Sequence, residues 1–234
     1  MFNFFLERII MDIKEESFLR DVENHQMIII RDDDVNRHVR FQHPGSSCML
    51  FDLITWPGYL CYTGDMGTFV FHRLRDMFEF FRTDREYNQR KGRQLSINLG
   101  YWSEKVEAAD RHDGIEKFDE ELFDHAVKSD VMAWIRDSFS DTTKEERREL
   151  WETVLNDVIG AESSSSGIFK QVAVSEFSYK VNDKVGDFYF QDFWDHNTNS
   201  YSQRFQWCCY AIAWGIQLYD DAKAEVVATN TATA

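Results

Sequence analysis

The fold is decided by residues 27–63, which read MIIIRDDDVNRHVRFQHPGSSCMLFDLITWPGYLCYT. Within this stretch, short apolar runs rich in β-branched and aromatic residues alternate with groups of turn-forming residues. The apolar runs lie at 27–30, 38–41, 49–54 and 59–62, and the turn residues lie at 32–34, 43–45 and 56–58. This alternation predicts a four-stranded antiparallel meander.

A helical pattern replaces the alternation after Gly67. Thr68 is suited to cap a helix over 69–82, because the apolar residues there repeat every three or four positions. This helix is expected to cover one face of the sheet. Further helices are predicted over 101–110, 118–139 and 143–159, followed by a long, buried helix from Asp192 and a flexible tail over 222–234.

We therefore predict an α+β fold in which all 234 residues form a single domain. A composition that is 43% hydrophobic and 15% aromatic can fill one large core. The predicted domain has a sheet-plus-helix subregion over 27–95 and a mostly helical, acidic subregion over 96–221, followed by the tail. The C-terminal helix is expected to pack across the join, so that both subregions share one core.

Charge narrows the classes of partner. The chain has 41 acidic and 26 basic residues and a formal charge of −15, which repels nucleic acid. No apolar run approaches the roughly 20 residues that a membrane-spanning helix needs.

The first ten residues lack the basic region and cleavage site of a signal peptide. We expect a cytoplasmic protein without membrane or direct nucleic-acid partners, whose true start is either Met1 or Met11.

Histidine and arginine side chains form the first candidate site. Strand alternation places Arg37 on one face of its predicted strand, and His38 and Arg40 on the other. Together with His72 in the following segment, they could form a cationic pocket for nucleotide or nucleic-acid chemistry. The alternative is that these side chains are solvated and form ion pairs with nearby acidic residues. If the protein is an enzyme, the catalytic candidates are His38, Arg40, Asp65 and His72.

The turn over residues 64–67 leads out of the last predicted strand. Its backbone N–H groups could face a phosphate, but Asp65 would repel an anion and the lysine of a Walker loop is missing. The acidic run 32–34 could ligate a divalent cation together with Asp52 or Asp65, although such runs are common in solvated turns. We expect neither a metal nor a cofactor.

The segment 190–196 offers another acid–base candidate. Asp192 and His196 have the four-residue spacing that places two side chains on one helix face, with Asp195 beside them. The alternative is a structural role, in which Asp192 caps a helix and His196 forms a hydrogen bond. The sequence contains no GxSxG, HExxH or CxxC pattern that would indicate a particular chemistry.

Two segments carry a resemblance to known proteins. Residues 51–67, FDLITWPGYLCYTGDMG, and residues 204–217, RFQWCCYAIAWGIQ, resemble a family of uncharacterised proteins encoded by tailed phages and prophages. The resemblance spans most of the chain after Met11. It implies a phage-borne accessory protein in a bacterial cytoplasm and no particular mechanism.

The leading hypothesis is a non-catalytic acidic protein that inhibits a host defence or nucleic-acid-processing protein. A DNA mimic or an anti-CRISPR protein works in this way, by occupying a cationic surface of the host protein. The alternatives are the enzyme described above and a role in virion assembly, and a homodimer is compatible with each. The expected partner-binding residues are Glu116, Asp119, Glu120, Glu121, Asp124, Glu145, Glu146 and Glu149. Their other interpretation is the solvated face of amphipathic helices.

Overall fold

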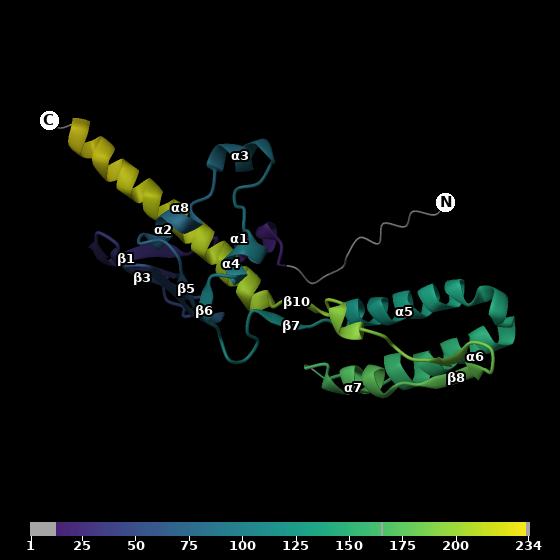
Figure 1. The fold of residues 1–234 in the computed structure, drawn as a ribbon. Coiled ribbons are helices and arrows are strands. Elements are labelled where there is room, and N and C mark those ends of the chain that lie inside the picture. The colour runs from purple at the N-terminus through teal and green to yellow at the C-terminus, as the bar shows by residue number, and fades with distance from the viewer. Residues whose placement is uncertain (1–12, 165, 233–234) are drawn as a thin grey trace. The chain divides into compact units, whose positions relative to one another are not determined.

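The computed structural model describes residues 13–164 and 166–232. The chain divides into two compact units (Figure 1). Unit 1 consists of residues 1–115 and 201–234, and unit 2 consists of residues 116–200. Unit 2 is thus inserted between two segments of unit 1, whereas the sequence analysis placed the boundary at residue 95. That all 234 residues act as a single domain stays a prediction.

Unit 1 is built on a six-stranded antiparallel sheet with the order β1-β2-β3-β4-β5-β6. The strands are β1 (Gln26–Asp33), β2 (Asn36–Gln42), β3 (Phe51–Trp56), β4 (Tyr59–Gly64), β5 (Gly67–His72) and β6 (Val106–Ala108). The predicted α+β class and the antiparallel N-terminal sheet are confirmed, but the sheet has six strands instead of four.

The predicted helix over 69–82 is wrong. Residues 67–72 form β5, and α2 (Met77–Phe81) is a short helix. Gly64 and Gly67 pair across a two-residue turn, so this segment closes a hairpin instead of starting a helix. Gly67 has φ +97°, a conformation that glycine adopts without strain. Phe69 and Phe71 are buried and the residues next to them are not, which is the two-residue repeat of a strand.

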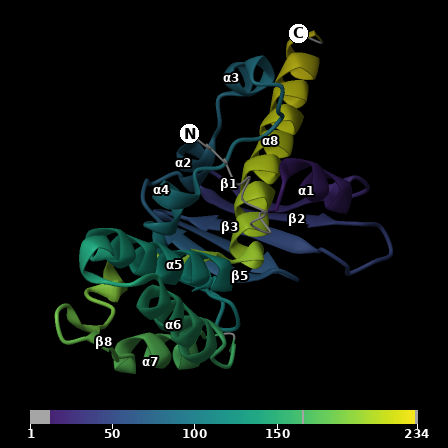
Figure 2. The same ribbon diagram turned by 90° about the vertical axis from the view of Figure 1, so that its right-hand side faces the viewer.

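Helices cover one face of the sheet. Figure 2 shows α8 (Gln203–Ala232) running across it, with α1 (Glu15–Val22) alongside. Side chains of α8 such as Trp207 and Ile212 are fully buried, together with Phe41 of β2. This helix begins at Gln203 instead of Asp192 and continues through the segment predicted as a tail, of which residues 233–234 lie outside the described part.

Two short helices and β6 complete unit 1. The segment between α2 and α4 contains α3 (Arg85–Arg90), capped by the side chain of Asp84. In place of the predicted helix over 101–110, the structure has α4 (Leu99–Ser103) and then β6 at the edge of the sheet.

Unit 2 is mostly helical. Its helices are α5 (Glu120–Asp137), α6 (Lys144–Val154) and α7 (Ile168–Glu176). The π-helical turn η2 (Leu155–Ile159) extends α6, and the 3-10 turns η1 (Phe139–Asp141) and η3 (Phe193–Asp195) lie in the connections. The strands are β7 (Glu116–Phe118), paired with β10 (Asn199–Tyr201), and the hairpin β8 (Tyr179–Asn182) and β9 (Gly186–Phe188).

The buried apolar residues form two clusters. One contains the inward side chains of the sheet and of α8, and the other contains Phe123, Val127, Leu150 and their neighbours in unit 2. All the buried α8 residues in the described part belong to the first cluster, and the core shared across a join stays a prediction. Among the described residues, no helix combines the length and the apolar character needed to cross a membrane.

Candidate functional site

His38 and Arg40 converge on one carboxylate at the sheet face opposite α8. Arg40 pairs with Asp52 across β2 and β3 and donates from Nε and Nη2 to its two oxygens, at 2.8 and 2.9 Å. His38 Nε2 lies 3.0 Å from Asp52 Oδ2. Burial raises the pKa of Asp52, but the hydrogen bonds from Arg40 and His38 outweigh it and leave the pKa below its ordinary value. The guanidinium is therefore already occupied by an internal anion.

Arg37 lies on the opposite face of β2, as strand alternation predicts. Only 8% of it is exposed, and its guanidinium forms two hydrogen bonds to Asp76. It also lies over the ring of Phe78 and donates to the hydroxyl of Tyr219. Arg37 thus joins the sheet to α2 and α8, and it contributes nothing to a pocket with His38 and Arg40.

The other two catalytic candidates lie elsewhere. His72 is on β5, three strands from His38, a separation of about 14 Å at ordinary strand spacing. Its ring stacks on Tyr59 at 4.4 Å. Asp65 lies in the β4–β5 turn and accepts a hydrogen bond from the backbone of Met49. The structure therefore brings His38 and Arg40 together and separates both from His72 and Asp65.

The acidic run 32–34 is also dispersed. Asp32 accepts from Tyr219 and Lys223, Asp33 pairs with Arg31, and Asp34 pairs with Arg75. Within residues 13–164 and 166–232, no group of three or more His, Cys, Asp or Glu side chains is placed to hold a metal ion.

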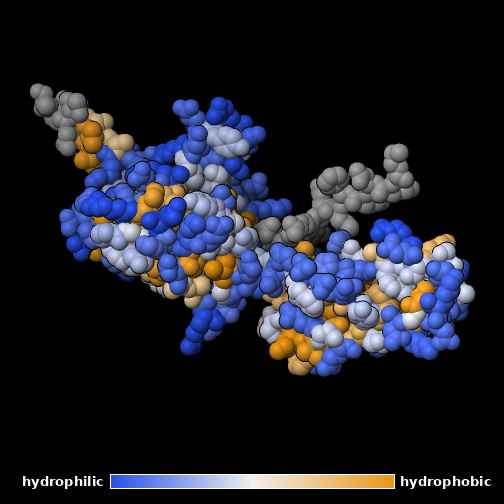
Figure 3. All heavy atoms as spheres, viewed as in Figure 1, coloured by the Kyte–Doolittle hydropathy of each residue, from blue (hydrophilic) through white to orange (hydrophobic). Residues whose placement is uncertain are grey.

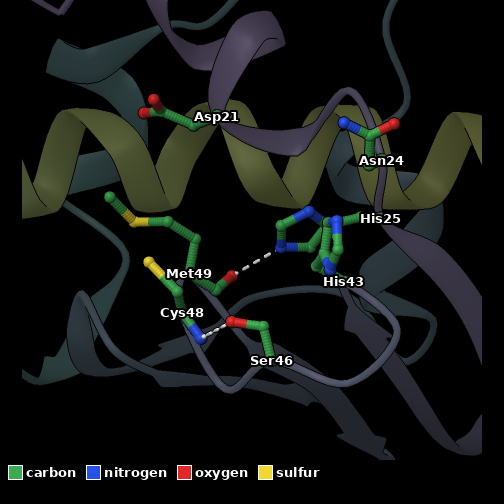
Figure 4. Close-up of a pocket in the computed structure, with 7 residues that line it drawn as sticks. All are labelled: Asp21, Asn24, His25, His43, Ser46, Cys48 and Met49. Carbon is green, nitrogen blue, oxygen red and sulfur yellow. Dashed lines mark hydrogen bonds between the residues drawn. The ribbon is translucent and has the colours of Figure 1, made fainter.

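A small hollow of about 230 Å³ in unit 1 was not anticipated (Figure 4). His25, His43 and Cys48 are among the residues that line it. Nε2 of His25 lies 2.9 Å from the carbonyl of Met49 and must donate, because a carbonyl only accepts. Nδ1 of His25 is buried without a hydrogen-bond partner. His43, Cys48 and Met49 lie in the loop between β2 and β3, whereas His25 lies in the turn before β1, so local spacing does not indicate this group.

Unit 2 carries most of the negative charge. Residues 116–200 contain 19 acidic and nine basic residues, a formal charge of −10 out of −15 for the chain. Several of the predicted partner-binding acids form contacts within the chain, and their role in binding a partner stays a prediction. Asp119 caps α5, Glu146 forms the capping box of α6 with Thr143, Glu145 pairs with Arg148, and Glu149 accepts from Tyr179.

Two further predicted acids hold a buried lysine. Lys170 is 1% exposed, and its ammonium lies 2.9 Å from Glu120 and 3.3 Å from Asp124. It also donates to the carbonyl of Ile159. The hydrogen bond from Lys170 keeps the pKa of Glu120 below its ordinary value. Of the eight predicted residues, Glu116 and Glu121 are exposed and form no ion pair within the described part of the chain.

An apolar patch lies beside this acidic surface. Ile168, Phe169 and Val172 of α7 are each about half exposed, and Trp194 of η3 is 79% exposed. Figure 3 shows hydrophobic side chains gathered over α7. We call these four residues the α7 patch. Exposed apolar side chains that gather in one place are typical of interaction surfaces.

A cavity of about 440 Å³ adjoins Trp194 within unit 2. Its walls include Phe190, Phe193, Trp194 and His196, with polar side chains between them. His196 Nε2 lies 2.9 Å from Asp130 Oδ1. The candidate Asp192–His196 pair on a helix face does not form, because residues 193–195 form only the turn η3 and His196 follows it in extended conformation. The alternative interpretation, a hydrogen-bonded histidine, agrees with the contact to Asp130, whereas Asp192 makes no side-chain cap.

The comparisons with known proteins leave the site to be interpreted from its own geometry. No family model, curated protein or solved structure matches this chain at a significant level.

Proposed function

We propose that this protein is a non-catalytic binding protein whose unit 2 docks on a cationic surface of a partner protein. One observation carries the proposal: a formal charge of −10 over 85 residues occurs together with the exposed α7 patch. Acidic groups speed the encounter with a cationic surface. Apolar and aromatic anchors then supply most of the affinity, and tryptophan is among the residues most often found in that role.

A host protein that binds nucleic acid is the partner class that we favour. Its nucleic-acid-binding surface is cationic. An acidic phage accessory protein that covers this surface would prevent the host protein from binding nucleic acid. The phage setting is the one that the resemblance in the sequence implies, and it is itself part of the proposal. Inhibition of a host defence protein, of the DNA-mimic or anti-CRISPR type, is therefore part of the proposal.

The enzyme alternative has less support. It needs Arg37, His38, Arg40 and His72 in one pocket, whereas Arg37 lies on the other face of the sheet and His72 lies three strands away. The remaining two side chains, His38 and Arg40, are both bound by Asp52.

The test is capture of a partner from bacterial lysate with the full chain, followed by a binding titration at several salt concentrations. The affinity is expected to fall at least about tenfold between roughly 0.05 and 0.3 M salt, because exposed charges are screened. The double variant Glu116→Lys/Glu121→Lys is expected to weaken binding by a similar factor. A partner whose affinity ignores both salt and this charge reversal would contradict the proposal.

A matched control is Glu79→Lys in unit 1. Glu79 is exposed on α2, far along the chain from unit 2, and its reversal changes the net charge by the same amount per residue. The melting temperature of every variant is measured, since lysine near the start of α5 opposes the helix dipole. Equal weakening by Glu79→Lys would show that only total charge matters.

A further inference from the structure

We propose that the cavity beside Trp194 receives an arginine side chain of the partner. This inference rests on the proposed docking of unit 2 and names the group that the partner inserts. The cavity, at about 440 Å³, is near the lower end of the range of about 300–1,000 Å³ that is typical of ligand pockets. It is open to solvent beside the most exposed tryptophan of the chain's described part.

The walls of the cavity favour a flat cation. Phe190, Phe193 and Trp194 provide aromatic surface in the lining. Phe190 and Phe193 are held edge to face, with centroids 5.6 Å apart, so this wall is braced by the core of unit 2. A guanidinium stacks on an indole face and is attracted by its quadrupole. Trp194 is therefore the expected stacking partner.

The charges close to the cavity in the sequence favour a cation over an anion as its ligand. Glu176, Asp192 and Asp195 are next to lining residues in the sequence, and no lining residue is a lysine or an arginine. His196 is held by Asp130. The neighbouring Lys170 is buried and bound by Glu120 and Asp124, so its charge is already balanced.

The polar lining distinguishes arginine from lysine. Gln171, Asn197 and Asn199 contribute amide groups, and Ser175 and Thr198 contribute hydroxyl groups. Amide and hydroxyl oxygens accept hydrogen bonds. A guanidinium has five N–H donors in one plane, so it can stack on Trp194 and reach several acceptors at once. An ammonium is more strongly hydrated and has no flat face to stack.

The direct test uses the full chain and the probe peptide acetyl-Gly-Arg-Gly-amide, with lysine and citrulline versions as comparisons. The readout is the NMR signal of the Trp194 indole N–H, assigned with Trp194→Phe. We expect this signal to shift saturably with the arginine peptide, to respond at least about threefold more weakly to the lysine peptide, and to stay in place with the uncharged citrulline peptide. No response to the arginine peptide, or an equal response to citrulline, would overturn the inference.

A captured partner provides the second test. Trp194→Ala is expected to weaken its binding at least tenfold, whereas Trp56→Ala, which removes a half-exposed tryptophan from unit 1, is expected to leave binding unchanged. If Glu116→Lys/Glu121→Lys weakens binding and Trp194→Ala does not, the docking of unit 2 stands and the arginine site is wrong. If the arginine peptide binds but the partner ignores salt and charge reversal, the proposed function fails and the arginine site stands.

Discussion

The guanidinium of Arg37 and the carboxylate of Asp76 form a two-bonded ion pair that joins β2 to the start of α2. The Nη1–Oδ1 distance is 2.8 Å and the Nη2–Oδ2 distance is 3.0 Å. Asp76 also accepts a hydrogen bond from the backbone of Phe78 and so caps α2. One carboxylate therefore balances a buried charge and starts a helix.

Replacing Asp76 with alanine is expected to lower the free energy of unfolding by about 3 kcal/mol, because it leaves the buried Arg37 without its anion. Loss of the cap adds to this cost. Urea denaturation followed by tryptophan fluorescence measures the change. The control is Asp34→Ala, which breaks an exposed pair with Arg75 and is expected to cost about 0–1 kcal/mol. Equal losses of free energy in the two variants would show that the buried Arg37–Asp76 pair contributes no more to stability than an exposed ion pair.

Stability is expected to fall in acid. Burial raises the pKa of Asp32, Asp52 and Asp76, but hydrogen bonds from Lys223, Arg40 and Arg37 outweigh it, and each pKa lies below its ordinary value. A carboxylate with a lowered pKa in the folded state contributes its full stability above the unfolded value of about 3.9. That contribution is lost as the pH falls through the lower, folded-state pKa.

Denaturant midpoints measured from about pH 6 down to about pH 2.5 check this sign. The wild-type midpoint should be flat at first and then fall below about pH 4. Asp52→Asn should be less stable at pH 6 and should show a shallower fall, because one of the three carboxylates no longer titrates. A wild-type midpoint that rises on acidification would contradict the assignment of these ion pairs.

At Gly215, α8 lies close to the side chains of the sheet. A Cβ added there would lie 2.9 Å from Phe41 Cζ and 3.0 Å from Leu53 Cδ1, and both side chains are fully buried. Gly215→Ala gains about 1 kcal/mol in helix propensity, but overpacking a rigid core costs about 1–3 kcal/mol. We expect a net loss of stability and a lower melting temperature.

Gly100→Ala is the matched control for that substitution. Gly100 lies in α4, and the nearest atom to an added Cβ is the Tyr201 hydroxyl at 3.9 Å, an ordinary contact. This variant is expected to be neutral or more stable by up to about 1 kcal/mol. A stabilised Gly215→Ala variant would mean that Phe41 and Leu53 yield easily and that α8 is not tightly packed.

The sequence predicted the strands better than the helices next to them. Residues 38–41 alternate between inward and outward side chains, so period two was unambiguous. Residues 69–71 fit both periods, because Phe69 and Phe71 are two apart while Phe69 and Val70 also fit a helical stripe with Leu74. The glycines at 64 and 67 were the deciding signal for a hairpin, and they were interpreted as the exit to a helix.

The candidate sites were less predictable, since their partners are remote in the sequence. Strand alternation correctly separated Arg37 from Arg40, yet it gave no sign of Asp76, which is 39 residues from Arg37. His196, which lines the cavity, pairs with Asp130, 66 residues away in the sequence. Only tertiary packing brings such groups together, so local spacing favoured Asp192 instead.

Substitution of Ile212 with aspartate tests whether the two hydrophobic clusters unfold separately. An unpaired charge in the core costs several kcal/mol against a total stability of about 5–15 kcal/mol, and Ile212 is fully buried in the unit 1 cluster. Hydrogen exchange is expected to show lost protection in the sheet, while amides around Val127 in unit 2 stay protected. Val226→Asp, on the exposed part of the same helix, should leave both units protected. Simultaneous loss in both units would instead support the single shared core that the sequence predicts.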